Sequence, residues 1–156
     1  MTTSVRREDI IAQLLAIVGD VPGPGPASVA TALRNHVAVP DDLLPAAIVF
    51  EGDEETVEQD QILGRRGITP TRVHMTPLVL LAAMGHAHQI GTTMNAWRGA
   101  IIQAIVTDET LLGIIQAPSG RVIYQSMESE IVRGERTIAR YVLKFQITYI
   151  LSPGAT

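Results

Sequence analysis

The fold is decided by the stretch Arg140-Tyr141-Val142-Leu143-Lys144-Phe145-Gln146-Ile147-Thr148-Tyr149-Ile150-Leu151. Large apolar side chains stand at every second position from Tyr141 to Leu151, and most of the positions between them are polar. Because successive side chains of a strand point to opposite faces, this alternation predicts a long strand with one buried face. The chain therefore contains a sheet whose closing strand lies near its C-terminal end.

Three further stretches predict strands that could join this one. Residues 46–50 form a short apolar run between Pro45 and Gly52, and residues 121–127 follow the turn Pro118-Ser119-Gly120. Residues 71–84 alternate at first, but Pro77 cannot donate a ladder hydrogen bond, so this strand is expected to bend or bulge there. The strands at 46–50 and 71–84, with the long loop between them, predict an antiparallel hairpin.

Helical periodicity marks four segments. Residues 4–18 predict an amphipathic helix, and Ser28 is expected to cap a short second helix with Val29, Leu33 and Val37 on one face. The strongest pattern begins after Thr92 or Thr93, where an apolar stripe places Trp97 as a core anchor; a short helix follows Asp108. The stripe consists of Met94, Trp97, Ile101 and Ile105.

The order of these elements predicts an α+β fold, with a mainly antiparallel four-stranded sheet and helices packed on one face. A chain of 156 residues suits a single domain, 1–156. Residues 1–45 are expected to form a helical N-terminal part with a rigid Pro-Gly loop at 22–26. The prolines and glycines of this loop are unsuited both to the interior of a helix and to the hydrogen bonding of a sheet. Residues 46–151 supply the sheet and the remaining helices.

Composition excludes several classes of protein. The chain has no cysteine, which excludes disulfides and thiolate metal sites, and its net charge of −4 argues against a general nucleic-acid binder. The longest apolar stretch, 77–85, is far shorter than a membrane span, so no membrane partner is expected. A hydrophobic content of 46% favours association with other subunits, because such interfaces resemble cores cut in half.

Motifs for chemistry are mostly missing. Phosphate-binding loops, a nucleophile elbow and H-E-x-x-H are absent from the sequence, so no catalytic, cofactor-binding or metal-binding residue is assigned. His86 and His88 share one side of an extended segment, but without a third ligand at defined spacing a polar turn is the simpler interpretation.

Residues 51–60 carry six acids and no base, which is typical of a solvated loop or a charged contact surface. If the segment docks against a partner or a neighbouring subunit, it needs complementary arginines. The candidate contact residues are Asp53, Glu54, Glu55, Glu58 and Asp60 on the acidic side and Arg65, Arg66, Arg133 and Arg136 on the basic side.

The order of the pieces from about residue 44 to 151 resembles the tail terminator proteins of long-tailed bacteriophages, also called tail completion or head-to-tail joining proteins. The resemblance rests on a short N-terminal helix, then the strand Ile48-Val49-Phe50-Glu51-Gly52-Asp53-Glu54, which opens into an acidic loop, then the strand 71–84 and the helix from Gly91. After Leu111-Leu112-Gly113 come the strand Val122-Ile123-Tyr124, the polar Glu128-Ser129-Glu130 and the closing strand 144–151.

This resemblance implies a homohexameric ring in the tail-neck region of the virion, assembled in the host cytoplasm. The ring would cap the tail tube, end its polymerisation, meet the head-tail connector, and let DNA pass its lumen without specific binding. Neither catalysis nor a cofactor is implied. Another neck or head-completion adaptor is the near alternative, and a small metal-dependent hydrolase using His86, His88 and the acidic segment is a distant one.

Overall fold

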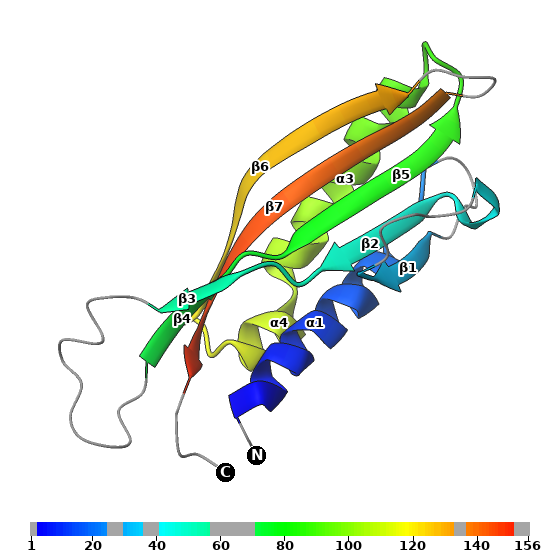
Figure 1. The fold of residues 1–156 in the computed structure, drawn as a ribbon. Helices are drawn as coiled ribbons and strands as arrows, with labels where there is room; N and C mark the ends of the chain where they lie inside the picture. The colour runs from blue at the N-terminus through cyan, green and yellow to red at the C-terminus, as the bar shows by residue number, and fades with distance from the viewer. Residues whose placement is uncertain (1–2, 25–29, 36–40, 57–70, 133–136, 152–156) are drawn as a thin grey trace.

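The computed structural model describes residues 3–24, 30–35, 41–56, 71–132 and 137–151 of the chain (Figure 1). In these residues helices and strands alternate in blocks along the chain. In chain order they are α1 (Thr3–Asp20), β1 (Thr31–Arg34), a 3-10 turn η1 (Asp41–Leu43), β2 (Ala46–Phe50), β3 (Glu54–Thr56), β4 (Thr71–Met75), β5 (Leu78–Gly85), α3 (Ile90–Thr107), α4 (Glu109–Ile114), β6 (Arg121–Val132) and β7 (Thr137–Leu151).

The strands form one mixed, mostly antiparallel sheet of seven strands in the order β1-β2-β5-β7-β4-β3, with β6 on β7 as well. The parallel pair is β1 with β2. On one side of β7, β5 pairs with residues 137–144 and β4 with residues 147–151, so these two strands lie end to end. On the other side β6 pairs with residues 138–148. The alternating stretch that predicted the sheet is thus the strand to which β4, β5 and β6 are all hydrogen-bonded.

Two neighbouring strand runs bend at the same level of the sheet. Thr76 and Pro77 separate β4 from β5, as Pro77 predicts, and Gly52 lies between β2 and β3 with a φ of 71°. A Cβ atom on Gly52 would lie 1.9 Å from the Thr76 carbonyl oxygen, and the Thr76 amide donates to the Asp53 carbonyl over 3.0 Å. The close approach of the two chains at this bend therefore requires glycine at position 52.

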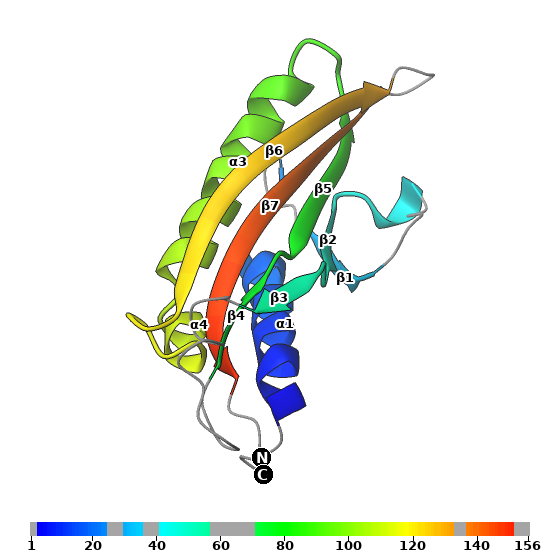
Figure 2. The ribbon, with the colours of Figure 1, turned by 60° about the vertical axis from the view of Figure 1, so that its left-hand side comes forward.

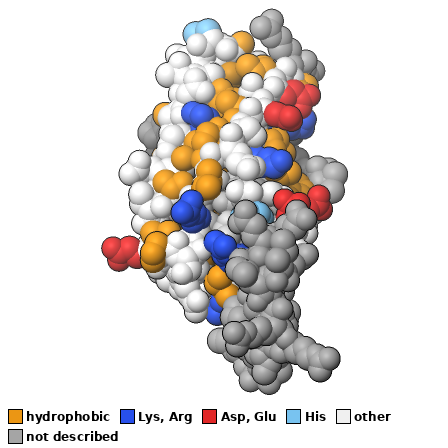
Figure 3. All heavy atoms as spheres, turned by 90° about the vertical axis from the view of Figure 1, so that its left-hand side faces the viewer, with side chains coloured by type: hydrophobic (Ala, Val, Ile, Leu, Met, Phe, Trp, Pro, Cys, Tyr) orange, Lys and Arg blue, Asp and Glu red, His pale blue; other side chains and the backbone are white. Residues whose placement is uncertain are grey.

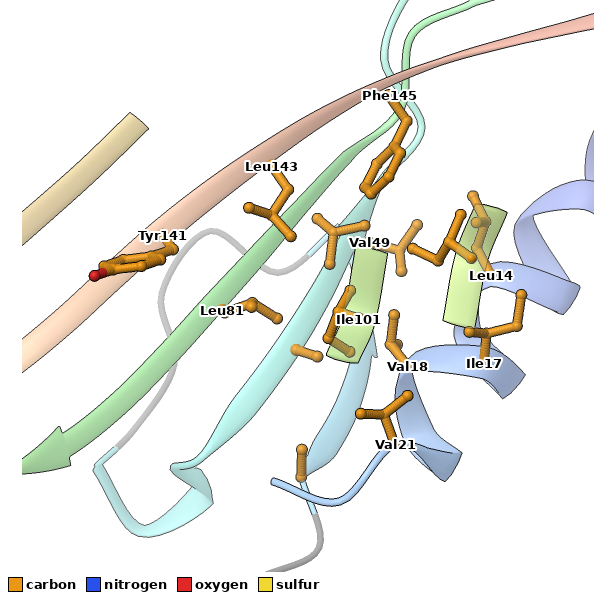
Figure 4. Close-up of a cluster of buried hydrophobic side chains, with 14 of the residues drawn as sticks. Leu14, Ile17, Val18, Val21, Val49, Leu81, Ile101, Tyr141, Leu143 and Phe145 are labelled. Atoms are coloured by element: carbon orange, nitrogen blue, oxygen red, sulfur yellow. The ribbon is translucent and has the colours of Figure 1, made fainter. Parts of the chain in front are cut away.

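The described helices cover one face of the sheet, and none of them lies on the other face (Figures 1 and 2). Helix α1 packs on β1 and β2, and α3 crosses β5, β6 and β7. The core lies between these layers and holds the inward side chains of β7, including Tyr141, Leu143 and Phe145 (Figure 4). The predicted α+β class and the single buried face of β7 are both confirmed.

The predicted apolar stripe of α3 is buried as a whole: Met94, Trp97, Ile101 and Ile105 are at most 2% exposed. Sequence placed the start of this helix at Thr92 or Thr93, whereas it begins at Ile90, and its N-cap Gln89 makes no side-chain capping bond. The second, shorter helix begins where predicted, because the Asp108 carboxylate accepts a hydrogen bond from the Leu111 amide.

Three expectations about the sheet were wrong. The sheet has seven strands rather than four, partly because the bend at Thr76 and Pro77 divides one expected run into β4 and β5, and residues 54–56 of the expected acidic loop form β3. The helix expected after Ser28 is instead the strand β1, because residues 31–34 find a hydrogen-bonding partner in β2. The strand expected at 121–127 continues to Val132, because residues 128–132 stay paired with β7.

Candidate functional site

The first residues of the acidic segment, just after β2, belong to a cluster of charged side chains brought from three parts of the chain. Arg34, at the end of β1, lies 3.0 Å from Glu51 and 2.7 Å from Glu8 of α1. The Asn35 side-chain amide donates to the Glu51 carboxylate over 2.8 Å. This hydrogen bond and the neighbouring Arg34 hold the pKa of Glu51 below its usual value, and the bond from Arg34 does the same for the pKa of Glu8.

The second half of this cluster lies at the bend. The Tyr149 hydroxyl of β7 donates a hydrogen bond to Glu54, and Arg7 of α1 lies 3.4 Å from the same carboxylate. Arg7 also donates to the Gly52 carbonyl over 3.0 Å. Burial of the phenol, together with the Glu54 carboxylate beside it, raises the pKa of Tyr149. The cluster therefore ties the start of α1 to the bend and to the end of β7.

These contacts correct the expectation of a wholly solvated acidic loop. Glu51 and Glu54 are occupied within the subunit, and residues 54–56 form β3, which pairs with β4. Asp53 and Glu55 are exposed, and no described residue forms an ion pair with either. Of the described acids in this segment, Asp53 and Glu55 are the two that are available to a partner.

The remaining predicted contact residues fall in parts of the chain that the structure does not describe. Glu58, Asp60, Arg65 and Arg66 lie between β3 and β4, and Arg133 and Arg136 lie between β6 and β7. Their part in a contact surface stays a prediction.

The histidine pair and the acidic segment lie at opposite ends of the sheet. Leu78 pairs with Phe50, next to the acidic segment, whereas His86 follows β5 at its other end (Figure 1). Eight strand residues at about 3.3 Å each separate the two ends by roughly 25 Å. The rings of His86 and His88 lie 6.3 Å apart, and no three histidine, aspartate or glutamate side chains among the described residues are grouped to hold a metal ion. The described residues therefore do not assemble the site that the hydrolase alternative needs.

Exposed apolar side chains gather on the edge strand β6. Four large hydrophobic residues are exposed in the described chain: Ile123, Ile131 and Val132 on β6, and Leu43 in the turn before β2. Figure 3 shows hydrophobic side chains reaching the surface between lysines and arginines on the side of the molecule where β6 lies. Such clustering at unpaired strand edges is typical of contact surfaces.

Sequence reasoning missed these edges. It ended the strand at Met127, so Ile131 and Val132 were not placed on a strand at all. The signal was present in the alternation Glu128-Ser129-Glu130-Ile131, which continues the period-two pattern in muted form. The charged cluster around Glu51 and Glu54 gave no comparable signal, because Arg7, Arg34 and Tyr149 come from distant positions.

No family model matches the chain, and no curated protein matches its sequence. No helix among the described residues is long and apolar enough to cross a membrane.

Proposed function

We propose that the chain is a structural subunit of a phage virion: a tail terminator that forms a ring at the head-proximal end of the tail tube. The ring is a homohexamer that stops tube polymerisation and offers its opposite face to the head-tail connector. DNA passes its lumen without specific binding, and the subunit needs no cofactor and performs no catalysis.

The observation that carries this proposal is the set of exposed apolar side chains on the edge strand β6. Native sheets protect open edges with charge and bulges, because an open edge recruits other strands, and β6 has both before its last two residues: Arg121, Glu128 and Glu130 are charged, and the pairing shifts between Tyr124 and Ser126. Here the larger edge, β6, is twelve residues long and carries Ile131 and Val132 with 49% and 39% of their surface exposed. A subunit that assembles with copies of itself has a use for such edges, whereas a monomeric enzyme has none.

Two further observations support the proposal. The order of helix, strand, acidic segment, bent strand, helix pair and long hairpin is the order on which the resemblance to tail terminators rests. Asp53 and Glu55 stand exposed at one end of the sheet, where they suit contact with a basic surface on the tube. Because Glu51 and Glu54 are held within the subunit, docking depends on fewer carboxylates than the six in the sequence.

The test is to delete the gene from the phage and to examine tails by electron microscopy. Loss of a terminator yields tubes of uncontrolled length that lack heads, and the wild-type protein supplied in trans restores uniform, joined tails. Tubes of normal length that only fail to join heads would identify the neck adaptor instead. An assembled tail that contains a single copy of the protein would contradict the ring.

Docking through the acidic segment is tested with Asp53→Asn and Glu55→Gln together. We expect the double variant to fold but to cap tubes more weakly than the wild-type protein. Capping by the wild-type protein should in turn weaken as salt rises, because salt screens exposed charge pairs. Glu109→Gln, which removes an exposed acid from α4, is the matched control and should cap normally. Normal capping with slow DNA ejection in the double variant would place the segment on the lumen.

A further inference from the structure

A polar row crosses the sheet on the face that the described helices leave open. Strand register places Glu55 of β3 opposite His74 of β4, which in turn lies opposite Thr148 of β7. Arg121 of β6 follows on the other side of Thr148. The two neighbours of His74 on its own strand are buried in the core beneath the helices. Because successive side chains of a strand point to opposite faces, His74 points to the helix-free face.

Thr148 fixes the orientation of the histidine ring. It is a polar side chain that is nevertheless buried, with 6% of its surface exposed. Its hydroxyl oxygen lies 2.7 Å from Nδ1 of His74, which is hydrogen-bond distance. The other ring nitrogen, Nε2, forms no hydrogen bond with a described residue. The ring is thus held at one nitrogen and has a second nitrogen to offer.

Glu55 is the described carboxylate nearest to His74 by strand register. Side chains directly opposite each other in an antiparallel pair have Cβ atoms about 4.5–5.5 Å apart, so an exposed glutamate can bring its carboxylate to the ring. Glu55 is exposed and forms no ion pair with a described residue. Asp53 lies two residues earlier, at the bend, and is farther from the ring. The carboxylate that can reach Nε2 is therefore that of Glu55.

Two cations face His74 from the described strands around it. Arg72 lies two positions earlier on β4, about 7 Å along the strand, and Arg121 lies two strands away, at about 10 Å. The residues of β7 that flank Thr148 on this face are uncharged. Both arginines disfavour a positive charge on His74, whereas Glu55 favours it. Because the Coulomb energy falls with distance, Glu55, which lies directly opposite, has the larger effect.

We propose that His74 is a pH-sensitive switch on the acidic contact surface, which withdraws Glu55 from a basic partner when the histidine ring is protonated. With a neutral ring, Glu55 is free for the partner. When the ring takes up a proton from solvent, Nδ1 donates to the Thr148 hydroxyl and Nε2 donates to the Glu55 carboxylate. Histidine is the side chain whose charge ordinarily changes between pH 5 and 8, so docking weakens as the pH falls through this range.

This inference rests on the proposed function for the identity of the basic partner, the tail tube. The pairing of His74 with Glu55 is argued from register, exposure and the held ring alone. It can therefore be tested in the free subunit, without phage tails.

The pairing is tested by NMR of protein carrying ¹³C in its glutamate carboxyl groups, between pH 8 and pH 5.5. In the wild-type protein the Glu55 carboxyl resonance should move as the histidine is protonated. In His74→Gln this movement should be lost, because glutamine can bond to Thr148 but gains no proton. His88→Gln removes an exposed histidine at the other end of the sheet and should leave the movement unchanged. Identical curves for Glu55 in the wild-type protein and in His74→Gln would overturn the inference.

The consequence for docking is tested by the binding of the protein to tube ends at pH 7.5 and pH 5.5. Wild-type binding should be about two- to fivefold weaker at pH 5.5, which is the contribution of one exposed ion pair. His74→Gln should lose this pH dependence, and Glu55→Gln should lose it too, because no carboxylate is left to withdraw. His88→Gln should keep it. The same pH dependence in the wild-type protein and in His74→Gln would contradict the switch.

Failure of the switch and failure of the proposed function give different results. If the protein caps tubes equally well at both pH values, the switch fails and the proposed function stands. If the Glu55 resonance follows His74 as expected but the protein caps tubes at neither pH, the proposed function fails and the pairing stands.

Discussion

Apolar side chains beneath α3 and apolar side chains at the sheet edges have the same chemistry but opposite surroundings. Trp97 and Phe145 are 2% and 0% exposed, whereas Ile131 and Val132 keep 49% and 39% of their surface in solvent. The free energy of burial of the first pair is gained when the subunit folds. The side chains of Ile131 and Val132 stay in solvent when the subunit folds, so their free energy of burial is gained only when another surface covers the edge. The contrast separates residues that stabilise the fold from residues whose apolar surface stays in solvent.

The largest effect is expected where burial is complete. Trp97→Ala should lower the free energy of unfolding by about 3–5 kcal/mol, because it leaves a cavity between α3 and the sheet. Chemical denaturation followed by circular dichroism measures this change. Trp97→Phe is the companion variant: no described residue accepts a hydrogen bond from the buried indole Nε1, so its loss leaves no partner unsatisfied and the cost should be well below that of alanine. An unchanged unfolding midpoint in Trp97→Ala would place this side chain outside the core.

A smaller effect is expected at the bend, where backbone rather than side chains is crowded. Gly52→Ala should destabilise the subunit by about 2–3 kcal/mol, because a Cβ atom there meets the Thr76 carbonyl at 1.9 Å and the φ is positive. Gly99→Ala is the control: it lies in α3 with open space around it, and should stabilise by about 0.5–1 kcal/mol. Thermal unfolding of both variants is the measurement, and equal effects would show that the bend tolerates a side chain.

The contribution of the charged cluster to stability can be measured through the pH dependence of unfolding. The pKa of Glu51 is lower in the folded than in the unfolded chain, so the unfolded chain binds more protons once the pH approaches 4.5. Stability from this carboxylate is therefore complete above that pH and is lost as the pH falls through the lowered, folded value. Unfolding followed between pH 3 and 7 should show a shallower acid loss for Glu51→Gln than for the wild-type protein. Parallel curves would mean that Glu51 is not coupled to folding.

The smallest effect on the subunit is expected at the edge. Ile131→Ser and Val132→Ser should change the free energy of unfolding by no more than about 0.5 kcal/mol, because exposed positions contribute little to the fold. The measurement is denaturation at a concentration low enough to keep the protein monomeric. A loss of several kcal/mol would break the comparison, since these side chains would then belong to the subunit's own core.

Sequence predicted the covered part of the molecule well, because burial leaves a periodic signature. The alternation in β7 and the stripe from Met94 to Ile105 each report one buried face, and both were found as expected. β1 was mistaken for a helix because its four residues carry no period of their own; they are a strand only because β2 lies beside them. A strand that depends on one distant partner has little local signature to detect.

The candidate site was less predictable for a related reason. Acids crowded together read as a solvated loop, yet Glu51 and Glu54 meet Arg34, Arg7 and Tyr149, which come from two other strands and a helix. Because these contacts join residues far apart in the sequence, no spacing between residues predicts them. The bend at Pro77 was expected because proline lacks an amide proton, whereas the matching bend at Gly52 becomes visible only with its partner Thr76 beside it.

The position of β7 in the sheet has a consequence for how the protein is made on the ribosome. β7 pairs with β4, β5 and β6, yet it is the last of the described strands to be synthesised. Until it emerges, β4 and β6 lack their hydrogen-bonding partner on β7, and one edge of β5 stays open. The nascent chain must therefore hold these apolar strands apart from those of its neighbours until residues 137–151 have emerged. Polysomes crowded with this message are where misassembly would begin, and slow formation of distant strand pairs lengthens that exposure.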